Sequence, residues 1–125
     1  MVALLGVLSL SAACHHQASL HAKQTATLTD SAKLFNDDLH WGYLDKAATF
    51  VEPDIRAAFL DSLTNQTQDI RYTDLQVAAV SFPKGQSEAT VTVTRNFYRA
   101  DNLKLQTETV QQHWYWKDGQ WWVKP

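Results

Sequence analysis

The stretch that decides the fold is residues 87–99, S-E-A-T-V-T-V-T-R-N-F-Y-R, in which apolar and polar side chains alternate. The apolar members of the alternation are Ala89, Val91, Val93 and Phe97. A repeat of two is the period of a β-strand with one buried face. The sequence therefore predicts a strand over 87–99 whose apolar side faces a core.

Three further segments extend this strand into a sheet. Residues 70–82 precede it and change phase after Ala79, which indicates a β-bulge, and residues 103–117 and 120–124 follow it. Pro83–Gln86, Asp101–Asn102 and Asp118–Gly119 are turn sequences between the segments. Strands joined by short turns pair as an antiparallel meander, so we expect four antiparallel strands. Trp114 and Trp116 share one face of the third strand, and the sequence leaves open which face meets the helices.

The segment before the sheet has the spacing of helices. Its apolar residues recur every three or four positions, namely Leu34, Phe35, Leu39, then Leu44, Ala47, Ala48, Val51, then Ile55, Ala58, Phe59, Leu63. Thr29-Asp30-Ser31 predicts a helix start, and Pro53 predicts the start of a third helix. Helices followed by strands predict an α+β fold, with the N-terminal helices packed on one face of the sheet.

The N-terminus has the features of an export signal. Residues 2–13, V-A-L-L-G-V-L-S-L-S-A-A, carry no charge and end in small residues. This run is shorter than the roughly 20 residues that span a bilayer, but it matches the apolar region of a signal peptide. We therefore expect residues 1–13 to be a signal peptide, residues 14–28 a flexible polar tether, and residues 29–125 the folded domain.

Ala12-Ala13-Cys14 resembles the lipobox of bacterial lipoproteins, with Ser11 at the position where the lipobox carries Leu. The resemblance implies that Cys14 carries fatty acyl chains such as palmitate and anchors the protein in a membrane. His15 follows the cysteine, which by the lipoprotein sorting rule favours the outer membrane, facing the periplasm. Two alternatives stay open: a soluble periplasmic protein cleaved after Ala13, and a short buried helix with an inert Cys14.

Composition excludes several classes of function. The net charge is −2, and no basic stripe is present, so nucleic acid is not an expected partner. The single cysteine forms no intrachain disulfide. The tether contains His15, His16 and His21, but three histidines without other ligands do not predict a metal site. No phosphate-binding, dinucleotide-binding or zinc motif occurs, so no cofactor is expected.

Residues 31–123 as a whole resemble an NTF2-like (cystatin-like α+β) domain. The likeness rests on the meander and on three short motifs: Gly42-Tyr43-Leu44-Asp45 with Ala47-Ala48, Gln112-His113-Trp114, and Lys117-Asp118-Gly119-Gln120-Trp121-Trp122. A narrower likeness, through residues 47–51 with Pro53, Arg56 and Phe59, is to uncharacterised proteobacterial lipoproteins. The resemblance implies helices packed against a strongly curved sheet in a cone-shaped fold.

Three hypotheses for function follow, because that superfamily includes isomerases, dehydratases and many non-catalytic domains. The first is an envelope lipoprotein without catalytic activity, whose domain binds a small apolar ligand or a partner protein. Its pocket candidates are Arg95, Tyr98, Gln111, His113 and Tyr115. The second is a small isomerase or dehydratase in which His113 acts with Asp74 or Tyr115 as acid and base. The third is a homodimer that pairs through exposed Trp residues on the outer face of the sheet.

Overall fold

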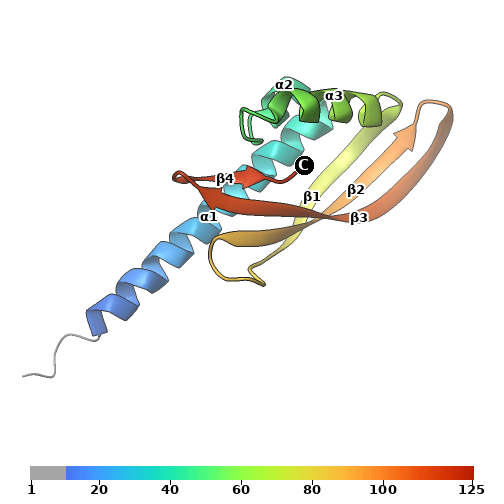
Figure 1. Ribbon diagram of the computed structural model, residues 1–125. Helices are drawn as coiled ribbons and strands as arrows, with labels where there is room; N and C mark the ends of the chain where they lie inside the picture. Colours follow the sequence, from blue (N-terminus) through green and yellow to red (C-terminus); the bar gives the residue numbers. More distant parts are fainter. Residues whose placement is uncertain (1–10) are drawn as a thin grey trace, which may run out of the picture.

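Three helices precede a four-stranded sheet along the chain (Figure 1). The computed structural model describes residues 11–125, with side chains from residue 22 onward. Its elements are α1 (Ser11–Trp41), α2 (Leu44–Ala48), α3 (Arg56–Thr67), β1 (Ile70–Ser81), β2 (Glu88–Arg99), β3 (Asn102–Lys117) and β4 (Gln120–Val123). The expected α+β fold is confirmed, and the strands begin and end within one residue of their predicted bounds.

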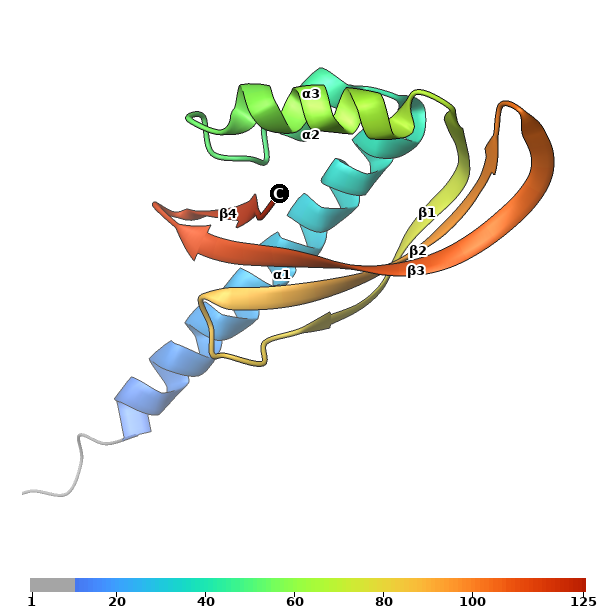
Figure 2. The same cartoon turned by 45° about the vertical axis from the view of Figure 1, so that its right-hand side comes forward.

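The sheet is an antiparallel meander with the order β1-β2-β3-β4. It curves strongly, and the helices lie on its concave side (Figure 2). We call the concave side the inner face and the convex side the outer face. The free edge of β4 is covered, because the Val123 backbone N–H donates to the Phe50 carbonyl at 2.9 Å. Covering this edge leaves fewer unpaired backbone groups for another chain to bind.

The predicted bulge in the first strand is present. The register of β1 against β2 shifts between Val77 and Ala79, and it shifts a second time between Tyr72 and Asp74. Because of the shift at Val77–Ala79, Val77 and Val80 both pack against the core although Val80 is an odd number of positions, three, after Val77. Each bulge also adds twist to the strand, which contributes to the curvature of the sheet.

The turn between β3 and β4 has two residues, Asp118 and Gly119, with φ angles of +54° and +78°. Positive φ at both positions is the requirement of a type I′ hairpin turn, for which Asp-Gly is a preferred sequence. The turn places Trp116 opposite Trp121, whose rings lie 5.4 Å apart in an edge-to-face arrangement.

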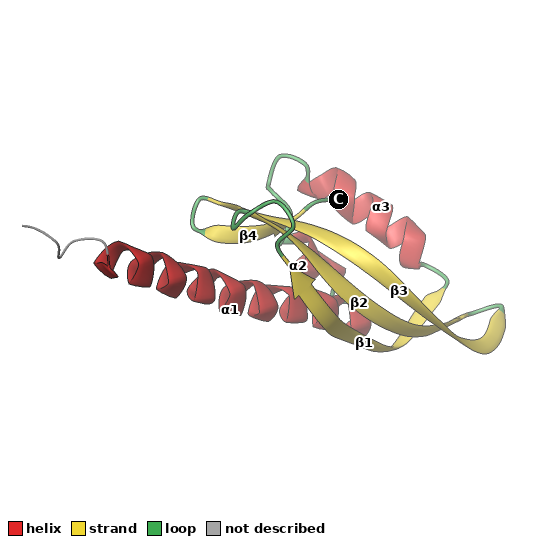
Figure 3. Cartoon of the chain, turned by 90° about the horizontal axis from the view of Figure 1, so that it is seen from below, coloured by secondary structure: helices red, strands yellow, loops and turns green. Residues whose placement is uncertain are grey.

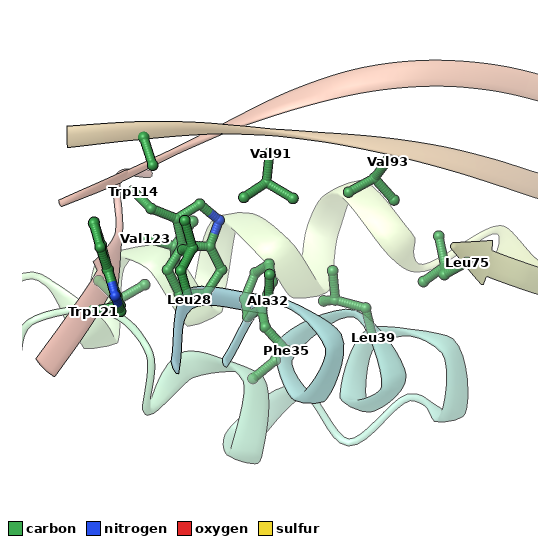
Figure 4. Packing of buried hydrophobic residues seen from close by; sticks show 13 residues of the cluster. Leu28, Ala32, Phe35, Leu39, Leu75, Val91, Val93, Trp114, Trp121 and Val123 are labelled. Atoms are coloured by element: carbon green, nitrogen blue, oxygen red, sulfur yellow. The ribbon is translucent and has the colours of Figure 1, made fainter. Parts of the chain in front are cut away.

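The core lies between α1 and the inner face of the sheet (Figure 4). From α1 it contains Leu28, Ala32, Phe35 and Leu39, and from the sheet Leu75, Val91, Val93, Trp114, Trp121 and Val123. Trp114 is 1% exposed, and its ring meets those of Phe35 and Phe50 edge to face at centroid distances of 5.6 and 6.0 Å. The face of β3 that carries Trp114 is therefore the one that meets the helices.

One polar pair is enclosed in this core. Asn36 is 1% exposed, and its side chain exchanges two hydrogen bonds with that of Gln112, at 3.1 and 2.9 Å. Asn36 Nδ2 also donates to the Ala32 carbonyl, and Trp114 Nε1 donates to Gln112 Oε1. Because a buried amide is costly unless it is paired, this reciprocal pair favours one alignment of α1 on β3.

Helix α1 is much longer than predicted. The expectation of a flexible tether over residues 14–28 is wrong, because these residues form part of one helix from Ser11 to Trp41, and the predicted helix start at Thr29-Asp30-Ser31 falls in its interior. Leu28 is fully buried, and Trp121 Nε1 donates to the Gln24 carbonyl at 3.0 Å. The packed turns provide a nucleus, and Ala, Gln and Lys extend a helix from such a nucleus at little cost.

The N-terminal part of α1 projects beyond the sheet (Figure 3). Of the predicted signal peptide, residues 1–10 lie outside the described residues. The described part of the chain contains no helix long and apolar enough to cross a bilayer. Lipidation of Cys14 remains a prediction, since the side chains of residues 11–21 lie outside the description.

Two other helix details differ from expectation. Leu34 is 58% exposed and lies off the core face of α1, because the buried positions follow Leu28, Ala32, Phe35 and Leu39. Helix α3 begins at Arg56 and not at Pro53, and Arg56 Nε donates to the Val51 carbonyl at 3.1 Å. This bond holds the start of α3 against the end of the preceding turn.

Candidate ligand-binding pocket

A hollow of about 550 Å³ lies where α1 ends, α3 ends and β1 begins. We call it the distal pocket, because it is at the end of the domain opposite the projecting part of α1 (Figure 1). Its apolar and aromatic walls are Leu39, Trp41, Leu44, Ile70 and Tyr72, and its polar lining includes His40, Thr64, Asn65, Thr67, Gln68 and Arg71. This volume is within the range of small-molecule pockets, which are also mostly apolar with a few polar groups.

The end of α1 forms one wall of the distal pocket. Gly42 has φ +74°; its N–H donates to the Leu39 carbonyl at 3.2 Å, and the Tyr43 N–H donates to the Asp38 carbonyl at 2.8 Å. These two bonds define a Schellman cap, in which glycine takes the left-handed position. The cap turns the chain sharply and leaves the Trp41 side chain 68% exposed on the pocket wall.

Three aromatic side chains, His40, Trp41 and Tyr72, define the chemical character of the distal pocket. The His40 and Trp41 rings stack face to face, with centroids 4.5 Å apart and an interplanar angle of 3°, so the imidazole covers part of one face of the indole. Tyr72 is half-buried, and its burial raises the pKa of the phenol above the usual value. Tyr72 is therefore a neutral hydroxyl across the physiological range, able to donate a hydrogen bond.

Arg95, one of the predicted pocket residues, lies on the inner face but does not line the distal pocket. Its guanidinium pairs with Glu108 on β3, and its Cζ lies 5.7 Å from the centre of the Tyr72 ring. Arg95 therefore packs against Tyr72, a residue that lines the distal pocket, without lining the pocket itself. Its charge is already neutralised by Glu108, which leaves it less suited to hold an anion.

The other predicted site residues, Tyr98, Gln111, His113 and Tyr115, alternate with inner-face residues and so lie on the outer face. His113 is exposed and pairs with Thr90, whereas Asp74 pairs with Asn96. Thr90 and Asn96 are six residues apart on β2, which corresponds to about 20 Å along a strand. The structure therefore brings His113 and Tyr115 to one face, as predicted, but it does not bring Asp74 to them.

Tyr115 belongs to a cluster at the end of the sheet. Its hydroxyl donates to Glu52 Oε1, and Lys117 Nζ pairs with Glu52 Oε2 at 2.9 Å. The hydrogen bond from Tyr115, followed by that from Lys117, lowers the pKa of Glu52, while burial and then Glu52 raise the pKa of Tyr115 to about 12. A phenol with this pKa is a poor base at neutral pH, and the cluster joins the α2–α3 connection to β3.

Smaller hollows border the outer-face residues. One of about 170 Å³ includes His113, and one of about 300 Å³ includes Tyr115. Lys124 lines both of them and forms an ion pair with Glu88 at 3.3 Å. Each hollow is smaller than the distal pocket, and no group of three or more potential metal ligands occurs among the described side chains.

Sequence reasoning missed the residues that line the distal pocket. Trp41 directly precedes Gly42, the glycine that ends α1, and a side chain at this position lies beside the helix cap. The sequence therefore contained a signal for Trp41. Arg71 and Tyr72 open a strand and gave no signal of their own. They become pocket residues because α3 ends directly above the start of β1.

Comparisons with known proteins agree with this architecture. No protein-family model matches the chain, and a search of curated proteins finds no match. A protein of unknown function from Mycobacterium tuberculosis superposes with a TM-score of 0.63 at 12% identity, over 85% of this chain and 70% of that one. A protein of unknown function with a cystatin-like fold from Nostoc punctiforme gives 0.57 at 10% identity, over 79% and 84%.

A third similar structure carries an activity in its name. It is a putative polyketide cyclase from Xanthomonas campestris, with a TM-score of 0.55 at 14% identity, over 78% of this chain and 87% of that one. At these identities the comparisons show the fold alone. The chain has the cystatin-like (NTF2-like) α+β fold, with an open four-stranded sheet.

Proposed function

We propose that this domain is a non-catalytic binding module that holds a small, largely apolar ligand in the distal pocket. The observation that carries the proposal is the pocket itself: about 550 Å³, walled by Leu39, Leu44 and Ile70, with the exposed Trp41 ring beside them. An exposed indole next to buried and half-buried aliphatic side chains offers a flat apolar surface for a ring or chain. Burial of that surface supplies the binding free energy.

The absence of catalysis is supported by where the acid and base groups lie. Neither Asp nor Glu lines the distal pocket, and its one candidate base, His40, has its ring stacked flat on the Trp41 indole at 4.5 Å. A dehydratase or isomerase needs a base placed within hydrogen-bond reach of a bound substrate. His113 and Tyr115 lie on the outer face, away from this pocket, and Asp74 lies about 20 Å from His113 along the sheet.

The homodimer alternative has less support than ligand binding. Trp114 and Trp121, which would have supplied an apolar outer face, are 1% and 2% exposed on the inner side. The central outer positions of β2 are instead Thr90, Thr92 and Thr94. A threonine row is not the large apolar patch that marks a subunit interface.

We place the protein in the bacterial envelope, anchored through lipid on Cys14 and facing the periplasm from the outer membrane. Helix α1 contains Cys14 near its start and Trp41 at its end, 27 residues apart, which is about 40 Å of helix. A lipid on Cys14 would therefore hold the distal pocket away from the bilayer. Detergent partitioning of the full chain against Cys14→Ser tests the anchor: we expect the variant to leave the detergent phase, and equal partitioning would contradict the lipid.

Ligand binding is tested with a neutral aromatic probe, 2-naphthamide. We expect it to bind the full chain and to shift the indole N–H signal of Trp41 in a proton–nitrogen NMR spectrum, because that ring lies on the pocket wall. Trp122 serves as an internal control, since its indole donates to the Lys117 carbonyl on the other side of the sheet. Equal shifts at both indoles would contradict binding at the distal pocket. The absence of a shift in either indole signal at any probe concentration would contradict it as well.

A further inference from the structure

The lining of the distal pocket has an uneven charge. Its polar side chains are neutral or basic, with Arg71 as the permanent cation. No carboxylate side chain lines it, although the full chain has more acidic than basic residues, 13 against 11. A bound anion would therefore meet no negatively charged side chain on the walls that repels it.

Arg71 is held in place at the pocket by its own backbone surroundings. Its Nη1 donates to the carbonyls of Gln68 and Ile70 at 3.3 and 3.1 Å. Within the described part of the chain, its remaining donors have no hydrogen-bond or ion-pair partner, whereas Arg95 has Glu108. A guanidinium fixed at one nitrogen with its other donors unused suits the planar, two-oxygen geometry of a carboxylate.

The aromatic groups complement this cation. Trp41 and Tyr72 line the same pocket, Trp41 with an exposed indole and Tyr72 with a neutral hydroxyl. Burial keeps the pKa of Tyr72 above its usual value, so the phenol does not become a competing anion near neutral pH. The pocket thus has a flat apolar surface, a hydroxyl and a fixed cation within one hollow.

We infer, resting on the proposed function, that the ligand class is an aromatic or amphipathic organic acid, with its apolar body against Trp41 and its carboxylate on Arg71. The apolar walls at Leu39 and Ile70 take the hydrocarbon part, and the rim takes the charge. This arrangement separates organic acids from neutral compounds of the same shape. It also disfavours organic cations, which would meet Arg71.

A matched pair of probes tests the inference. The probes 2-naphthoate and 2-naphthamide share one ring system and differ in charge, so their dissociation constants on the full chain isolate the contribution of the acid. We expect naphthoate to bind about tenfold more tightly, as for one charge-assisted contact at a partly exposed site. In Arg71→Gln we expect naphthoate to lose this preference, so that the two probes bind with about equal affinity.

Lys84→Gln is the control, because it removes the same charge from the β1–β2 turn, which does not line the distal pocket. We expect it to keep the full preference for naphthoate. Equal binding of both probes to the unmodified chain, or a preference that survives Arg71→Gln, would overturn the inference and leave the pocket proposal standing. Failure of both probes to bind would overturn the proposed function as well.

Discussion

Leu28→Ala is expected to lower the free energy of unfolding by about 3 kcal/mol, the usual cost of truncating a buried leucine. Leu28 is fully buried although it lies in the segment whose composition is that of a tether. It packs in the same cluster as Trp121 and Val123 of β4, so its loss leaves a cavity between the helix and that strand. Urea denaturation of the full chain, followed by circular dichroism, measures the change.

Leu34→Ala on the same helix is the matched control. Leu34 is 58% exposed, and alanine is the stronger helix former, so we expect a change within about 0.5 kcal/mol. If Leu28→Ala were as mild as Leu34→Ala, helix α1 would not pack on β4 at this position. The folded domain would then start later in the chain, as the sequence alone had predicted.

Trp114→Ala is expected to cost about 4 kcal/mol, within the range for a large buried aromatic side chain. Its ring is 1% exposed, and it meets Phe35 of α1 and Phe50 of the α2–α3 connection edge to face. The substitution therefore removes contacts that join three segments distant in sequence. The same urea denaturation measures the loss in the free energy of unfolding. The slope of that free energy against urea concentration shows whether the unfolded state has changed.

Trp122→Ala gives the comparison for the opposite face of the sheet. Trp122 is half-buried, and its indole donates to the Lys117 carbonyl at 3.0 Å, so its removal should cost about 1 kcal/mol. A larger loss for Trp122→Ala than for Trp114→Ala would mean that the helices cover the other face of the sheet. That outcome would also move His113 and Tyr115 to the inner side.

The sheet was predictable because its signals are local. Alternation along β2 and the three turn sequences each determine the backbone over a few residues, and the strand bounds predicted from such signals agree with the structure to within one residue. Even the bulge near Ala79 appeared as a change of phase in the sequence. Interactions between residues close in sequence are sufficient for these features, since each depends on neighbours within the strand or the turn.

The start of α1 was not predictable in the same way. Residues 14–28 have a polar, short-chained composition, but Leu28 is fully buried in the core and the Gln24 carbonyl accepts a hydrogen bond from Trp121. The Gln24 carbonyl is bound by β4, 97 residues later in the chain, and Leu28 packs in a cluster formed largely by the sheet. The sequence of residues 14–28 by itself carries no information about a partner so distant in the chain.

The distal pocket was equally beyond the sequence. It requires α3 to end above the start of β1 and the Gly42 cap to leave Trp41 at the wall. Both are features of the tertiary structure. The predicted pocket candidates were all on β2 and β3, and the sequence left open which face of these strands meets the helices. In the structure Arg95 lies on the inner face and His113 on the outer face. A fold-level resemblance cannot replace this information, because function depends on the side chains of the site.

The most direct measurement of the central claim is a nuclear Overhauser experiment on the full chain with bound 2-naphthoate. We predict cross-peaks from the naphthalene protons to the Trp41 indole, the Ile70 methyl groups and the Tyr72 ring, which line the distal pocket. Cross-peaks to Tyr115 or Trp122 on the outer face, or none to any protein proton, would contradict the account.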